Sequence, residues 1–253
     1  MIRVRHLFAA TVYLAMQTGL ASAADLKVYS TIGVQAAMGE LAPVFEKQSG
    51  DRLAFTFNTA AALTKHIQAG EHADAMILTR ANLEALAKEN KASGHITPVA
   101  SSGISVVVKS GAPKPDISTP EALKATLLKA KSIAYSDPAA GGASGVYVGK
   151  MIGRMGLADQ LKGKTKHPPA GGNAAHLVAS GEAELAIQQT PEVMSAKGVD
   201  LVGPLPGDLN KVTHFAADIN TSPSAKSSAE AFVKFLSSPE AVKVFKARGL
   251  EPG

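Results

Sequence analysis

The pattern that indicates the fold begins with LKVYSTIGVQAAMGELAPVFEKQSGDRLAFTFNTA, residues 26–60. A short apolar run at 26–30 is typical of a buried strand. Apolar residues at helical spacing follow from Met38 to Phe45, and a second β-rich run occupies 53–57. A strand, a helix and another strand in this order predict a parallel sheet whose crossover connection is right-handed.

The same alternation continues to the C-terminus. Further strands are expected at 75–78, 103–109, 132–135, 185–188, 201–202 and 212–219. Further helices are expected at 62–69, 81–88, 145–157, 225–236 and 239–248, and after the N-cap candidate Thr119. The sequence therefore predicts an α/β protein without repeats or coiled coils.

Two β-rich runs, 103–109 and 212–219, bracket the middle of the chain and suggest two crossing strands of a hinge. This interpretation gives lobe one at residues 24–103 plus 220–253 and lobe two at residues 104–219. The C-terminal helices then return to lobe one. A single continuous domain is the alternative, because periodicity alone does not exclude it.

The N-terminus has the composition of a secretory signal peptide. Arg3, Arg5 and His6 form a basic region, 7–16 are apolar, and Ala21-Ser22-Ala23 supplies the small residues of a cleavage site. The apolar stretch is shorter than the about 20 residues of a membrane span. We therefore expect residues 1–23 to be removed and the mature chain to be periplasmic, without membrane insertion. An uncleaved anchor is the alternative.

Composition excludes several function classes. The chain has no cysteine, so disulfides, thiol catalysis and a lipidated N-terminus are excluded. Aromatic residues make up 5% and tryptophan is absent, which disfavours stacking on sugars or single-stranded nucleic acid. The formal charge of +5 falls to +3 if Arg3 and Arg5 leave with the leader. No basic cluster indicates a nucleic-acid partner, whereas a mild positive excess is compatible with a small anionic ligand.

Candidate ligand-binding residues follow from the expected sheet. In open α/β sheets, ligands bind at the carboxyl ends of strands and at helix N-termini, where N–H groups lack partners. The residues at these positions are Thr31, Gly33, Thr59, Ala60, Arg80, Ser144, Gly145, Asn173, Gln188 and Gln189. The glycine-rich run 141–145 is either an anion cradle or a plain turn. Arg80 either clamps a carboxylate or is solvated.

Catalytic patterns are sparse. The histidines lack metal-binding spacing, and no G-x-S-x-G elbow indicates a serine hydrolase. We therefore expect no metal and no cofactor, and the sequence identifies no general base.

Several segments together resemble the bacterial periplasmic molybdate-binding proteins, over essentially the whole mature chain. They are residues 28–37, 57–70, 73–79, 137–138, 144–147 and 235–241. The resemblance implies a type II periplasmic-binding fold: two α/β lobes joined by two crossing strands. It also implies an oxyanion held between the lobes by neutral hydrogen-bond donors.

The molybdate ligands of that family are not all present. In the alignment, its two ligand serines fall on Gly33 and Ala60 and its ligand tyrosine on Gln189, while two backbone donors fall on Ser144 and Asn173. Each lost hydrogen bond to a charged oxygen costs about 1.5–3 kcal/mol. Molybdate is therefore expected to bind weakly or not at all, unless neighbouring threonines replace the missing hydroxyls.

The chain is also similar to a subgroup that includes bacterial aconitate isomerase. That similarity implies a 1,3-proton shift between cis- and trans-aconitate, which needs carboxylate clamps and an acid/base group but no cofactor. Two hypotheses follow. The chain is an exported solute-binding protein that delivers a small oxyanion or organic polycarboxylate to an ABC-transporter permease, or it is an isomerase. A monomer is expected in either case.

Overall fold

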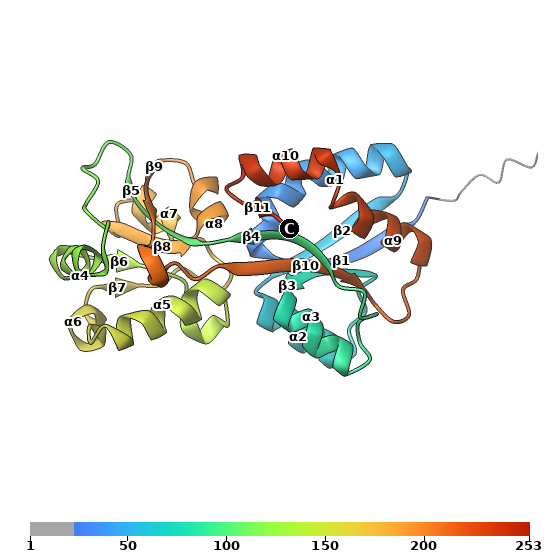
Figure 1. Ribbon diagram of the computed structural model, residues 1–253, viewed down its shortest axis with the longest axis horizontal. Helices are drawn as coiled ribbons and strands as arrows, with labels where there is room; N and C mark the ends of the chain where they lie inside the picture. The colour runs from blue at the N-terminus through green and yellow to red at the C-terminus, as the bar shows by residue number, and fades with distance from the viewer. Residues whose placement is uncertain (1–22) are drawn as a thin grey trace, which may run out of the picture.

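A computed structural model describes residues 23–253. Apart from Ala23, the expected signal peptide lies outside the described residues. Within residues 23–253, no helix is long and apolar enough to cross a membrane. The chain forms two α/β lobes, each with its own sheet, as the sequence predicted (Figure 1).

The first sheet has the strand order β11-β4-β10-β3-β1-β2. Its strands are β1 (Asp25–Thr31), β2 (Arg52–Asn58), β3 (Ala75–Thr79), β4 (Thr97–Ser102), β10 (Thr213–Ile219) and β11 (Glu251–Pro252). β1 pairs in parallel with β2 and β3, which confirms the expected parallel pairing. β10 pairs antiparallel with β3 and β4.

The second sheet has the strand order β7-β6-β8-β5-β9. Its strands are β5 (Ile104–Lys109), β6 (Ile133–Ala134), β7 (Thr165–Lys166), β8 (Leu185–Gln189) and β9 (Val199–Pro204). The central β5 is antiparallel to both β8 and β9. Its Ile, Val and Ser side chains are buried because helices cover both faces of this sheet.

Helices cover both faces of the first sheet (Figure 1). α1 (Gln35–Ser49), α9 (Lys226–Phe235) and α10 (Pro239–Ala247) pack on one face, where the rings of Phe45 and Phe232 lie 5.2 Å apart. α2 (Ala60–Gln68) and α3 (Arg80–Lys88) pack on the other. The C-terminal helices therefore return to lobe one, as expected.

In the second lobe, α4 (Pro120–Lys129), α5 (Ala143–Arg154) and α6 (Ala158–Lys162) cover one face of the sheet. α7 (Ala175–Ala179) and α8 (Thr190–Ser195) cover the other. Three short 3-10 turns complete the described chain: η1 (Ile32–Val34), η2 (Pro138–Ala140) and η3 (Gly207–Leu209).

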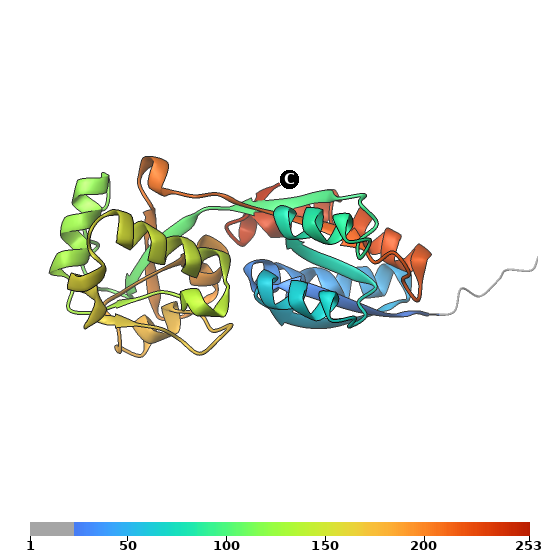
Figure 2. The same ribbon diagram turned by 90° about the horizontal axis from the view of Figure 1, so that it is seen from below.

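The expected lobe boundary near residue 220 is wrong. Residues 213–219 form β10 of the first sheet, and Phe215, Ala217 and Ile219 lie in the core beneath α1 and α9. The two connections between lobes are therefore Gly103, between β4 and β5, and residues 205–212, between β9 and β10. Figure 2 shows both connections along one edge of the molecule. The expected hinge strands 103–109 and 212–219 each lie within one sheet.

Candidate functional site

A cavity lies between the two lobes, with about 500 Å³ of empty space including its open mouth. Lobe one contributes the ends of β1 and β2 and the first residues of η1 and α2. Lobe two contributes the start of α5, the loop 169–172 and the turn from β8 into α8. The lining residues are Thr31, Ile32, Gly33, Thr59, Ala60, Ser136, Asp137, Ala140, Gly142, Ala143, Ser144, 169–172, Gln189, Glu192 and Phe215.

The lobes touch beside this cavity. Thr59 is the N-cap of α2, because its Oγ1 accepts a hydrogen bond from Ala62 N at 3.2 Å. The same hydroxyl donates to Ala140 O of the other lobe at 3.1 Å. Gly141, in a left-handed conformation, packs so closely that an added Cβ would lie 3.0 Å from Ala61 Cβ. The structure is therefore closed on this side, and Thr59 connects the lobes.

Two hydroxyls on the cavity wall are free to bind a ligand. Thr31 and Ser144 are only 5% and 4% exposed, and neither side chain has a hydrogen-bond partner among the described residues. Ser144 also lies in the first turn of α5, where backbone N–H groups lack intrahelical partners. The start of α2 at Ala60 faces the same cavity. This part of the wall offers neutral donors to an anion.

The structure explains why one expected ligand hydroxyl is missing. A Cβ on Gly33 would lie 2.7 Å from Cζ of Phe215, whose ring lines the cavity. A serine at position 33 therefore requires the Phe215 ring to move. Ala60 likewise offers only its backbone.

The Gln189 side chain is hydrogen-bonded next to the connections between the lobes. With its amide nitrogen directed at Gly103 O, 3.0 Å away, its oxygen accepts from the Thr213 hydroxyl at 2.8 Å. Gln189 thus fastens β8 to Gly103, which connects the lobes, and to Thr213, the first residue of β10. Both polar atoms of its side chain are hydrogen-bonded within the protein, although Gln189 is part of the cavity lining.

Glu192 is the residue that the sequence analysis missed. It lies in the first turn of α8 and lines the cavity. Gln188 Nε2 donates to Glu192 Oε2. Burial raises the pKa of Glu192 to about 7, although the hydrogen bond from Gln188 opposes this shift. A carboxyl group in the first turn of a helix that follows a buried strand was the available sequence signal.

The other oxygen of Glu192, Oε1, is not paired within the described part of the protein. Oε1 has no hydrogen-bond partner among the described residues. No buried side-chain oxygen in residues 23–253 lacks such a partner, so Oε1 is not enclosed by protein. No ion pair among these residues involves Glu192. Glu192 is half-buried, and its side chain is held by a neutral amide rather than by a cation.

Four expected site residues lie outside the cavity lining. Arg80 pairs with Glu84 at 2.9 Å, has a side chain 53% exposed, and lines a different hollow. A Cβ on Gly145 would lie 2.4 Å from Ser136 O, so its role is close packing. Arg80 and Gly145 therefore do not line the cavity, and their contact with a ligand stays a prediction.

Gln188 and Asn173 do not line the cavity but hydrogen-bond to Glu192, which does. Gln188 is fully buried, and its Oε1 accepts from Ala174 N at 2.7 Å while its Nε2 holds Glu192. Asn173 Nδ2 donates to Glu192 O. Asn173 also lines a second hollow, which shares Gly33 and Glu192 with the cavity and adds His176.

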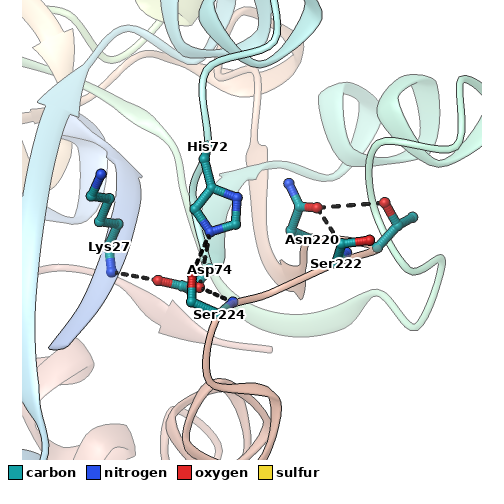
Figure 3. Close-up of polar contacts among 7 residues, drawn as sticks. Lys27, His72, Asp74, Asn220, Ser222 and Ser224 are labelled. Atoms are coloured by element: carbon teal, nitrogen blue, oxygen red, sulfur yellow. Dashed lines mark hydrogen bonds and ion pairs between the residues drawn. The ribbon is translucent and has the colours of Figure 1, made fainter. Parts of the chain in front are cut away.

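A Ser, His and Asp cluster lies at the amino end of β3, where the loop before β3 meets the loop before α9 (Figure 3). His72 Nε2 lies 3.1 Å from Asp74 Oδ1 and 3.0 Å from Ser224 Oγ. A catalytic triad uses different ring nitrogens for its acid and its nucleophile, whereas here one nitrogen meets both. Asp74 also accepts from the N–H groups of Lys27 and Ser224, so the cluster fastens strands to the loop before α9.

The cavity lining contains no Lys, Arg or His side chain. Within residues 23–253, no group of three or more acidic residues or histidines could hold a metal ion. The cavity wall therefore presents N–H and hydroxyl donors together with the carboxyl groups of Asp137 and Glu192.

Comparisons with known proteins agree with this geometry. The family profile of the bacterial extracellular solute-binding proteins matches residues 26–251. Aconitate isomerase of a Pseudomonas species is 33% identical over 90% of this chain and 87% of its own length. The molybdate-binding protein ModA of Escherichia coli is 26% identical over 91% of this chain and 90% of its own. The periplasmic molybdate-binding protein of Azotobacter vinelandii superposes with a TM-score of 0.73 at 22% identity, covering 90% and 99% of the two chains.

Proposed function

Because the chain belongs to the family of bacterial extracellular solute-binding proteins, we propose that it is exported and binds a small organic polycarboxylate between its lobes. We further propose that it interconverts cis- and trans-aconitate by a 1,3-proton shift. Export rests on the leader at residues 1–23, whose cleavage releases a periplasmic protein.

One observation carries this proposal: the cavity wall combines neutral anion donors with a carboxyl group, that of Glu192, which has a raised pKa and no cationic partner among the described residues. Thr31, Ser144 and the first turns of α2 and α5 supply donors for carboxylates. Glu192 supplies a group that exchanges a proton near neutral pH. Binding of an anion does not by itself require such a group, whereas a proton shift requires an acid/base group.

The missing hydroxyls argue against molybdate. Gly33, packed on Phe215, and Ala60 provide no side-chain donor, and the Gln189 amide is occupied at the hinge. The relative at 33% identity carries the name aconitate isomerase, which supports a planar tricarboxylate as ligand.

Transport is the second candidate. The family profile spans residues 26–251, and relatives with this fold include a substrate-binding domain of a putative molybdenum ABC transporter. In this case the closed protein would deliver an unaltered polycarboxylate, or another small oxyanion, to a permease. The chain would act as a monomer in both candidates.

A thermal-shift screen followed by NMR tests the proposal. The mature protein, from Ala24 onward, is heated with molybdate, sulfate, citrate, cis-aconitate or trans-aconitate. We expect both aconitates to raise Tm and each to be converted into the other. Stabilisation by aconitate without conversion favours transport. Stabilisation by molybdate alone contradicts the polycarboxylate assignment.

A further inference from the structure

We propose that Glu192 is the catalytic residue that carries the proton in this reaction, and that Gln188 is the positioning residue that aims it. This inference rests on the proposed isomerase function and names its acid/base group. The Glu192 carboxyl group lies between the buried amide of Gln188 and the cavity.

The two oxygens of Glu192 have different surroundings. Oε2 accepts from Gln188 Nε2, and Gln188 is itself fixed because its own Oε1 accepts from Ala174 N at 2.7 Å. Gln188 is fully buried, and Glu192 is half-buried and lines the cavity. Oε1 has no hydrogen-bond partner among the described residues and is not enclosed by protein. The carboxyl group is therefore held by one oxygen, while the other oxygen is free to contact a ligand.

The backbone around Glu192 is fixed as well. Asn173 Nδ2 and Ser195 Oγ both donate to the carbonyl oxygen of Glu192. Pro191 before it is buried in the first turn of α8. A general base must be held within reach of the proton that it abstracts, and these contacts hold the main chain of Glu192.

The protonation state suits the role. Burial raises the pKa of Glu192 to about 7, so at neutral pH a substantial fraction of the carboxyl groups is ionised. A carboxylate with a raised pKa is a stronger base than an ordinary one, and bases with a pKa near the operating pH are the most effective. Asp137, the other carboxyl group on the cavity wall, accepts from Ala139 N at 2.9 Å as the N-cap of η2.

The step balances with Glu192 alone. The Glu192 carboxylate takes a proton from the methylene carbon of aconitate, so an O–H bond forms and a C–H bond breaks. The released electron pair forms a new C=C bond, and the former C=C pair moves to the other end of the allylic unit. That carbon then takes the proton back from the Glu192 carboxylic acid. The side chain ends as a carboxylate, and no electrons are gained or lost.

The test is Glu192→Gln, which keeps the side-chain volume and can still accept from Gln188 through its amide oxygen. Binding of trans-aconitate is measured by calorimetry, turnover by NMR, and exchange of the methylene protons in ²H₂O separately. We expect affinity within about threefold of wild type, and both exchange and isomerisation reduced at least about 100-fold, the usual worth of general acid–base catalysis. Glu230→Gln, on the exposed surface of α9, is the matched control and should change none of these.

The pH profile gives a second readout. In the wild type, kcat/KM should rise about tenfold per pH unit below about 7 and level off above it, because it reports the free protein's base. Gln188→Leu should shift this profile to higher pH, because the hydrogen bond that lowers the pKa of Glu192 is lost. A Gln188 variant with lower activity but an unchanged profile would show a merely structural role for Gln188.

The outcomes separate the two proposals. An active wild type with an equally active Glu192→Gln variant overturns the assignment of Glu192 but leaves the isomerase. A variant that loses isomerisation but keeps methylene exchange also overturns it, because another group then takes the proton. A wild type that binds aconitate without converting it overturns the isomerase and the role of Glu192 together.

Discussion

Replacing Glu192 by Gln is expected to change how the stability of the protein depends on pH, independently of any ligand. In the folded chain burial raises the pKa of Glu192 to about 7, from an ordinary value of 4.5. Between these values the folded chain holds a proton that the unfolded chain has released. Each increase in pH therefore favours unfolding, and the free energy of unfolding falls until pH exceeds the folded pKa.

The magnitude follows from the two pKa values. One pKa unit corresponds to about 1.4 kcal/mol, so the full difference is on the order of 3 kcal/mol. About 2.5 kcal/mol of this loss falls between pH 5 and pH 9. Glutamine does not ionise, so the variant should not suffer this loss. The unfolding free energy of the variant relative to wild type should therefore rise by about 2.5 kcal/mol over the same pH range.

Urea denaturation at pH 5 and pH 9 measures this difference, with Glu230→Gln as the control on an exposed carboxyl group. The control should stay within about 0.5 kcal/mol of wild type at both pH values, as surface substitutions usually do. If the Glu192→Gln and wild-type curves stay parallel between pH 5 and pH 9, Glu192 titrates as an ordinary exposed carboxyl group. The reasoning that places a raised pKa in the cavity would then be refuted.

Three further predictions concern the site and its scaffold. Arg80→Ala should leave the affinity for trans-aconitate within about twofold of wild type, because Arg80 pairs with Glu84 outside the cavity and exposed ion pairs contribute little. A tenfold loss of affinity in calorimetry would show that Arg80 contacts the ligand. Ser144→Ala should weaken the same binding at least about tenfold, since a hydrogen bond to a charged oxygen is worth about 1.5–3 kcal/mol, and unchanged affinity would exclude this hydroxyl as a ligand. Burial opposes the ionisation of Asp74, but N–H donors outweigh it and hold the pKa of Asp74 below its ordinary value. Asp74→Asn should therefore lower the unfolding free energy at pH 7 by about 1–3 kcal/mol. In thermal melts this cost should shrink below about pH 4, and a cost that stays constant with pH would exclude the charge of Asp74 as its source.

Much of the fold could be predicted from local sequence. The runs at 26–30, 53–57 and 75–78 became β1, β2 and β3 with parallel pairing, because their apolar patterns and helical spacers leave few other topologies. β4 was missed because Thr97–Ser102 consists of Thr, Pro, Ser and Ala residues with a single valine. Its pairing with β10 depends on chain segments more than 100 residues apart.

The candidate site was predicted only in part. Strand ends and helix starts indicated Thr31, Gly33, Thr59, Ala60, Ser144 and Gln189, and all six line the cavity. The direction of side chains was not predictable. Arg80 follows β3 at the expected place, yet its side chain turns toward Glu84 at the i+4 position of α3 and away from the cavity.

The sequence by itself indicated parallel βα units and neutral donors at one edge of the sheet. Its resemblance to the molybdate-binding proteins implied that three ligand hydroxyls are absent, at Gly33, Ala60 and Gln189. These properties depend on residue type and on spacing within a few turns of the chain. Only the tertiary structure placed β10 in the first lobe, set Phe215 against Gly33, and enclosed Glu192 between a buried amide and the cavity. Burial is a property of the packed lobes together, and burial alone converts an ordinary glutamate into a carboxyl group that exchanges its proton near neutral pH.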